Sequence, residues 1–149
     1  MRIQTKYLGE AKIKSANIIT FAAGIPGFNE ETEFVLMDIP GNAGFQILQS
    51  VTSVNVAFIV TNPHQIYPKY TFELDDNMLE TLQIKNEKEV VVLTIVTIKD
   101  PFQESTLNLK APIIINPVSK KGKQYIINHD EYETKAAMTP QYSQRAEGE

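Results

Sequence analysis

The sequence predicts a mostly β protein, a small antiparallel β-barrel or sandwich with one short helix. Three observations support this class. Short runs rich in β-branched and aromatic residues recur along the chain, Gly and Pro separate them, and a single stretch has helical periodicity. Closing the sheet into a barrel would pair the edges that so many short strands otherwise leave open to aggregation.

The strands expected in the first half alternate apolar and polar residues or are β-branched throughout. They are residues 2–8, 16–21, 33–39, 45–50 and 54–61. The third ends at Pro40-Gly41 and the fifth at Asn62-Pro63, because both dipeptides favour turns. These five segments are half of the strands that the sequence predicts.

The second half opens with an ordered loop over 63–70, which holds two prolines and two tyrosines, and a short strand is expected over 70–74. Residues 76–84 then change to helical spacing. Asn77, followed three residues later by Glu80, suits a capping box. The sequence therefore predicts one short helix here.

The strongest strand signal lies at 89–99, where both faces are apolar or Thr, so we expect a central strand covered on both sides. Segments 105–112, 113–116 and 123–128 complete the expected strands. The sequence SKKGK between the last two predicts a hairpin turn with Gly122 at the position of positive φ.

A chain of 149 residues suits one domain, which we expect to span residues 1–128. Residues 129–149 are polar, and we expect a partly disordered C-terminal tail. The absence of Cys excludes disulfides, thiol nucleophiles and Cys-ligated zinc, and it fits a reducing compartment.

Charge and hydropathy restrict the compartment and the partners. The N-terminal MRIQTKYLGE has no apolar core of a signal peptide, and the longest apolar run is too short and too rich in Thr to span a membrane. A cytoplasmic protein without membrane contact is expected. The formal net charge of −4 argues against direct binding of nucleic acid, and it suits a basic protein partner as well as ordinary solubility.

Catalytic and metal-binding patterns are missing from the sequence. His64 and His129 lie far apart and have no second ligand at metal-binding spacing, and helix capping explains Asp75-Asp76 without catalysis. There is no phosphate-binding Gly-rich loop and no nucleophile elbow. The lysines of 120–123 are expected to form a solvated turn. We therefore expect neither an enzyme nor a cofactor nor a metal site.

The stretch FAAGIPGF, residues 21–28, combines strong turn residues with apolar side chains. Two interpretations remain open: its apolar residues plug the core, or they are held out for a partner. Phe21 and Phe58 are assigned to the core. Tyr and Phe often anchor protein interfaces, so exposed aromatic loop residues are binding candidates.

Four motifs in this order resemble the flagellar assembly factor FliW family: FAAGIPGF, FQILQS, FIVTNPHQIYPKY and LKAPIIIN followed by a KKGK turn. The resemblance covers about residues 1–128. It implies a small cytoplasmic β-barrel-like protein that binds newly made flagellin and also binds CsrA, a translational repressor of flagellin mRNA. Competition between the two partners would release translation when flagellin is exported. The sequence leaves open whether CsrA is blocked directly or allosterically.

This resemblance favours a partner-facing role for several residues. The candidate partner-binding residues are Ile25, Pro26, Phe28, Gln49, Tyr67, Pro68 and Tyr70. The packing role of the first three residues stays open, as does a structural role for the polar Gln49. An alternative function is a small-ligand or cofactor-binding β-barrel, because the mouths of small barrels can hold ligands.

Overall fold

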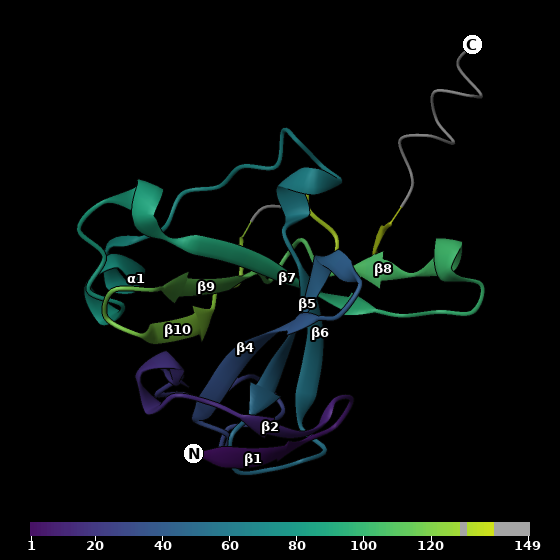
Figure 1. Ribbon diagram of the computed structural model, residues 1–149. Coiled ribbons are helices and arrows are strands. Elements are labelled where there is room, and N and C mark those ends of the chain that lie inside the picture. The colour runs from purple at the N-terminus through teal and green to yellow at the C-terminus, as the bar shows by residue number, and fades with distance from the viewer. Residues whose placement is uncertain (129–130, 139–149) are drawn as a thin grey trace.

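The computed structural model describes residues 1–128 and 131–138 of the chain. Seven strands close into a barrel (Figure 1). They are β3 (Ile19–Thr20), β4 (Glu33–Ile39), β5 (Asn42–Ser50), β6 (Ala57–Thr61), β7 (Val91–Thr97), β9 (Ile113–Asn116) and β10 (Lys121–Gln124). The order around the barrel is β7-β6-β5-β4-β3-β10-β9, and β9 returns to β7. The expected fold class is confirmed.

One pairing departs from the antiparallel arrangement that was expected. β3 and β10 run parallel, with Thr20 opposite Lys121, while the other barrel pairs are antiparallel. The connection between β3 and β10 is almost the whole barrel, so no tight turn dictates their direction.

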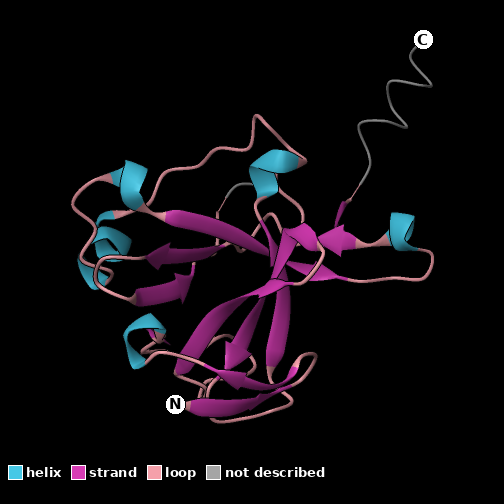
Figure 2. Cartoon of the chain, in the orientation of Figure 1, coloured by secondary structure: helices cyan, strands magenta, loops and turns pink. Residues whose placement is uncertain are grey.

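The remaining elements lie around this barrel (Figure 2). β1 (Arg2–Thr5) and β2 (Gly9–Lys12) form a separate hairpin, and β8 (Thr106–Leu107) and β11 (Ala136–Ala137) extend the sheet beyond β7. The helix α1 covers Asp76–Thr81. Short 3₁₀ turns are η1 (Ser15–Asn17), η2 (Pro63–Gln65), η3 (Glu87–Glu89) and η4 (Phe102–Glu104).

Two local expectations for residues 70–84 are wrong. Residues 70–74 form no strand. The N-cap of α1 is Asp75, whose Oδ1 accepts the N–H of Met78 at 2.9 Å, and Asn77 lies inside the helix. Asp75 has the extended backbone of an N-cap residue, so it takes the role that the sequence pattern gave to Asn77.

Gly122 was also placed wrongly. The residue of positive φ in this turn is Lys120 (φ 58°), and Gly122 has a different reason to be glycine. A Cβ at Gly122 would lie 2.6 Å from the Cζ of Phe21, which is fully buried. The bare backbone of β10 therefore lets the Phe21 ring pack against the barrel wall.

The barrel interior is filled by side chains. The main core contains Ile19, Phe21, Ile25, Phe34, Leu48, Val60, Leu93, Ile113 and Ile115. Phe21 and Phe58 were both assigned to the core. Phe21 is fully buried, whereas Phe58 is partly buried and packs against the edge of this cluster. A second cluster lies outside the barrel around Tyr70, Leu107 and Leu109.

Packing continues beyond the domain boundary expected at residue 128. β11 pairs with β8 through Ala136 and Leu107, and the side chains of Ala136 and Met138 are buried in the second cluster. Residues 131–138 therefore pack on the rest of the chain. His129 and the final part of the expected tail lie outside the described residues.

Candidate protein-binding surface

The GIPGF loop is a tight turn whose shape is fixed by its glycines. The N–H of Phe28 donates to the C=O of Ile25 at 2.6 Å, which places Pro26 and Gly27 at the centre of the turn. Gly27 has φ 88°, the value that a type II turn requires after proline. Gly24 has φ 69°, and a Cβ there would lie 2.6 Å from the carbonyl oxygen of Phe28.

The apolar residues of this loop differ in their burial. Ile25 is only 1% exposed and packs in the barrel core, so of the two open interpretations the packing role describes this residue. Phe28 is 40% exposed, and its ring meets the edge of Phe58 at a centroid distance of 5.4 Å. Pro26 is exposed at the tip. The turn thus anchors itself through Ile25 and presents Pro26 and Phe28.

Gln49, near the end of β5, is a buried hub of hydrogen bonds with no exposed surface. Its Oε1 accepts the N–H of Lys6 at 3.0 Å, in the turn between β1 and β2. Its Nε2 donates to carbonyl oxygens of the connection between β5 and β6, including that of Val54 at 3.2 Å. The candidate Gln49 therefore has a structural role in this structure: it ties two loops together.

Glu31 fastens the GIPGF loop to the same connection. Its carboxylate accepts hydrogen bonds from the hydroxyls of Ser50 at 2.5 Å and Ser53 at 2.8 Å. These two bonds, with a third from Thr52, hold the pKa of Glu31 below its usual range, although partial desolvation acts against them. Like Gln49, this carboxylate ties loops together that are distant in the sequence.

Together these bonds bring three loops to one end of the barrel, where β1 and β2 also lie (Figure 1). Four exposed residues on these loops form what we call the three-loop surface: Tyr7, Pro26, Phe28 and Val54. Tyr7 and Val54 were missed as site candidates. The sequence pattern assigns Val54 to a strand, but it lies in the loop before β6. Tyr7 also lies in the expected strand 2–8, and nothing in the sequence distinguishes it from a strand residue.

The second group of candidates does not form an exposed aromatic patch. Tyr70 is 4% exposed, its hydroxyl donates to the C=O of Leu109 at 2.6 Å, and burial raises its pKa well above the usual value. The expectation that Tyr70 is exposed is wrong. Tyr67 is half-buried and its hydroxyl donates to the C=O of Ala137, so only Pro68 is fully on the surface. Tyr67 therefore contacts the chain's own C-terminal segment, and so does the ring of Tyr70, which packs against Tyr132 at a centroid distance of 4.7 Å.

The described residues show no cluster of metal ligands. No group of three His, Cys, Asp or Glu side chains there could hold a metal ion. His64 lies with Nδ1 3.2 Å from the Oδ1 of Asn62 and Nε2 2.9 Å from the C=O of Tyr70, which gives it a place in loop structure. Within the same residues, no helix is both long enough and apolar enough to cross a membrane.

Comparison with known proteins agrees with this architecture. The sequence model of the FliW protein family matches residues 2–138. The chain belongs to the FliW family. A flagellar assembly factor FliW of Oceanobacillus iheyensis is 51% identical over 138 residues, which cover 93% of this chain and 94% of that protein. The FliW of Bacillus subtilis strain 168 is 46% identical over 135 residues, covering 91% and 94%.

A crystal structure of a flagellar assembly factor FliW has the same fold. The TM-score is 0.90 at 43% sequence identity, and the match covers 94% of this chain and 98% of that one. The resemblance inferred from the four sequence motifs is therefore confirmed, and these FliW relatives are named as flagellar assembly factors.

Proposed function

We propose that this chain is a non-enzymatic, cytoplasmic regulator of flagellar assembly that binds flagellin and CsrA in turn. While it holds flagellin, CsrA represses translation of flagellin mRNA; after flagellin leaves, the chain binds CsrA and translation resumes. Membership of the FliW family over residues 2–138 is the observation that carries this proposal.

The three-loop surface supports a docking role. Phe28 and Tyr7 offer large, rigid apolar area with few rotatable bonds, the property that makes aromatic residues energetic centres of interfaces. Gln49 and Glu31 hold the loops in place before binding, which lowers the entropy lost on association. We place at least one partner on this surface.

Partner exchange requires only a modest difference in affinity. When two partners exclude each other, occupancy follows their concentrations divided by their dissociation constants, and about 1.4 kcal/mol is a tenfold preference. An abundant flagellin can therefore displace CsrA without binding more tightly. The net charge of −4 favours encounter with a basic RNA-binding protein.

The first test is calorimetric titration of the purified chain with flagellin, with CsrA, and with CsrA after saturation by flagellin. We expect binding to each partner and loss of CsrA binding in the third titration. Failure to bind either protein would remove the proposal, and simultaneous binding of both would remove the exchange mechanism.

The variant Phe28→Ala tests the docking role of the three-loop surface. We expect at least one complex to weaken by more than about 1 kcal/mol, because an interfacial aromatic anchor is lost, while the melting temperature stays within a few degrees. Val118→Ala, which truncates a 77% exposed apolar residue outside this surface, is the matched control and should bind normally. Unchanged affinity with a large loss of stability would assign Phe28 to packing.

The alternative of a ligand-binding barrel has less support. The barrel interior is occupied by Phe21, Phe34, Leu48 and Ile113, none of which is exposed, so an internal ligand would have to displace core side chains. A small molecule that copurifies in stoichiometric amount, detected by mass spectrometry, would revive this alternative.

A further inference from the structure

The seam between β6 and β7 is incomplete. β6 pairs with β7 at only two positions, Val60 and Thr61. The chain then turns into η2, where Asn62 is the N-cap and Pro63 has no N–H to donate to a ladder. On its other edge, β7 continues to pair with β9 from Val91 to Leu93. The first residues of β7 therefore have a strand on one edge only within the described part of the chain.

Val92 directs its backbone groups toward the open edge. The C=O of Ile95 accepts the N–H of Asn108, on the side of β7 where β8 and β9 lie. Along an antiparallel strand the backbone groups alternate between the two edges, so those of Thr94 and Val92 face the β6 side. Thr94 lies opposite Thr61 of β6, whereas no strand of the described residues lies opposite Val92 there.

A groove of about 460 Å³ lies along this edge. Its walls come from Ala43, Gly44 and Gln46 at the start of β5, from His64 and Gln65 of η2, and from residues 90–93. None of its lining side chains carries a formal charge when His64 is neutral. The groove thus occupies the space that a longer β6 would have filled.

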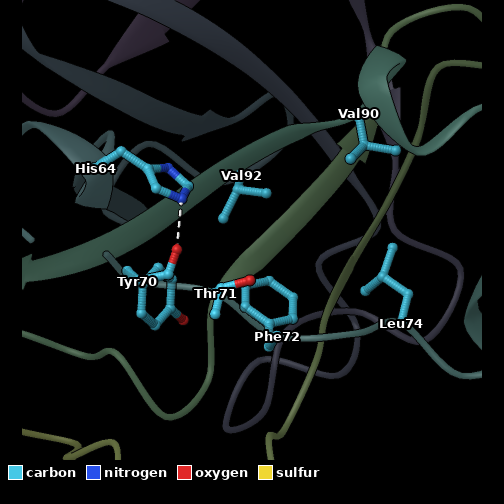
Figure 3. A pocket seen from close by; sticks show the side chains of 7 residues that line it. All are labelled: His64, Tyr70, Thr71, Phe72, Leu74, Val90 and Val92. Atoms are coloured by element: carbon cyan, nitrogen blue, oxygen red, sulfur yellow. Dashed lines mark hydrogen bonds between the residues drawn. The ribbon is translucent and has the colours of Figure 1, made fainter. Parts of the chain in front are cut away.

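A smaller pocket of about 160 Å³ adjoins the same edge (Figure 3). It shares His64, Val90 and Val92 with the groove, and its other lining residues are Tyr70, Thr71, Phe72 and Leu74. A strand laid beside Val92 would alternate its side chains between these two surroundings. One set would meet Phe72 and Leu74 in the pocket, and the other set would meet the amides of Gln46 and Gln65 in the groove.

We propose that this open edge binds one extended segment of flagellin by strand addition beside Val92. An unpaired strand edge with pockets for alternate side chains is the arrangement that recognises extended peptides. The uncharged lining of the groove favours a segment of alternating apolar and uncharged polar residues. A binding site for a basic RNA-binding protein would present carboxylates, and the groove has none. This inference rests on the proposed function, of which it names one contact site.

Amide hydrogen exchange measured by NMR tests the site directly. We expect the N–H of Val92 to exchange at least tenfold more slowly in the complex with flagellin, because it gains a hydrogen-bond partner, and to be unchanged in the complex with CsrA. Flagellin binding without protection of Val92, or protection by CsrA instead, would overturn this inference and leave the proposed function standing. A chain that binds neither partner would remove both.

A variant at the rim separates the groove from the three-loop surface. Ala43 is exposed, so Ala43→Arg should fold normally while its long cationic side chain obstructs the groove. We expect flagellin affinity to fall at least tenfold, CsrA affinity to stay within twofold, and Ala43→Ser to behave as the unaltered chain. Unchanged flagellin affinity in Ala43→Arg, with a normal melting temperature, would place the segment elsewhere.

Discussion

Gln49 organises one end of the barrel through a single buried amide. Its oxygen accepts a hydrogen bond from the turn between β1 and β2, and its nitrogen donates to the connection between β5 and β6. A buried polar group that loses its partner costs more than the hydrogen bond contributes, because the orphaned group stays desolvated. Gln49 therefore stabilises the three-loop surface as well as the fold.

Replacing Gln49 by Ala should lower the free energy of unfolding by at least about 2 kcal/mol, because the N–H of Lys6 and the C=O of Val54 lose their bonds to its amide. Urea unfolding followed by circular dichroism measures this loss. Gln46→Ala on the same strand removes one exposed bond to Asp38 and should change stability far less. Equal losses in the two variants would contradict the hub role.

Glu31 should make stability depend on pH in the acid range. Its folded pKa is lowered by the hydroxyls of Ser50 and Ser53, so its contribution is complete above the pKa of the unfolded chain and is lost as pH falls through the folded pKa. Unfolding free energies of the unaltered chain and of Glu31→Gln should differ most above about pH 5 and converge below it.

A variant of Ser53, which donates to Glu31, extends this test of pH dependence. Ser53→Ala removes one of the two main hydrogen bonds to Glu31, so its stability should fall between the other two curves at neutral pH. A constant difference between the unaltered chain and Glu31→Gln at every pH would show that the carboxylate charge contributes nothing.

At the scale of elements, periodicity located most strands because alternation reports which face is buried. It failed over 70–74, where the apolar residues Phe72 and Leu74 pack into a side cluster without any strand pairing. It also left the direction of Ile25 open and missed the burial of Tyr70, since a turn or a loop can point its apolar residue inward as easily as outward. Pairing and loop direction depend on contacts distant in sequence, which a local pattern does not contain.

Asp75 and Asn77, at the start of α1, can be compared by their contributions to the stability of the helix. Asp75→Ala should cost about 1 kcal/mol in the free energy of unfolding, because it removes the N-cap bond to Met78. Asn77→Ala, inside α1, should cost less than about 0.5 kcal/mol. Thermal unfolding of both variants measures the two losses of stability. A larger loss in Asn77→Ala would show that Asn77 is the N-cap residue, as the capping-box pattern predicted.

At the scale of the whole molecule, residues 131–138 pack on the rest of the chain, and truncation tests how much they stabilise it. Ending the chain after residue 130 removes β11 and the buried side chains of Ala136 and Met138, so we expect a loss of at least about 2 kcal/mol. Ending it after Met138 keeps every described contact and should leave the melting temperature nearly unchanged. If both truncations melt alike, the segment 131–138 contributes no stability.

The parallel contact between Thr20 and Lys121 joins two points that lie most of a chain length apart. Contacts of such long range form late and slow a folding reaction, because their loops cost the most entropy to close. During synthesis, the wall of this protein stays open at this contact until Lys121 has left the ribosome. A nascent chain that ends before β10 therefore cannot close the barrel.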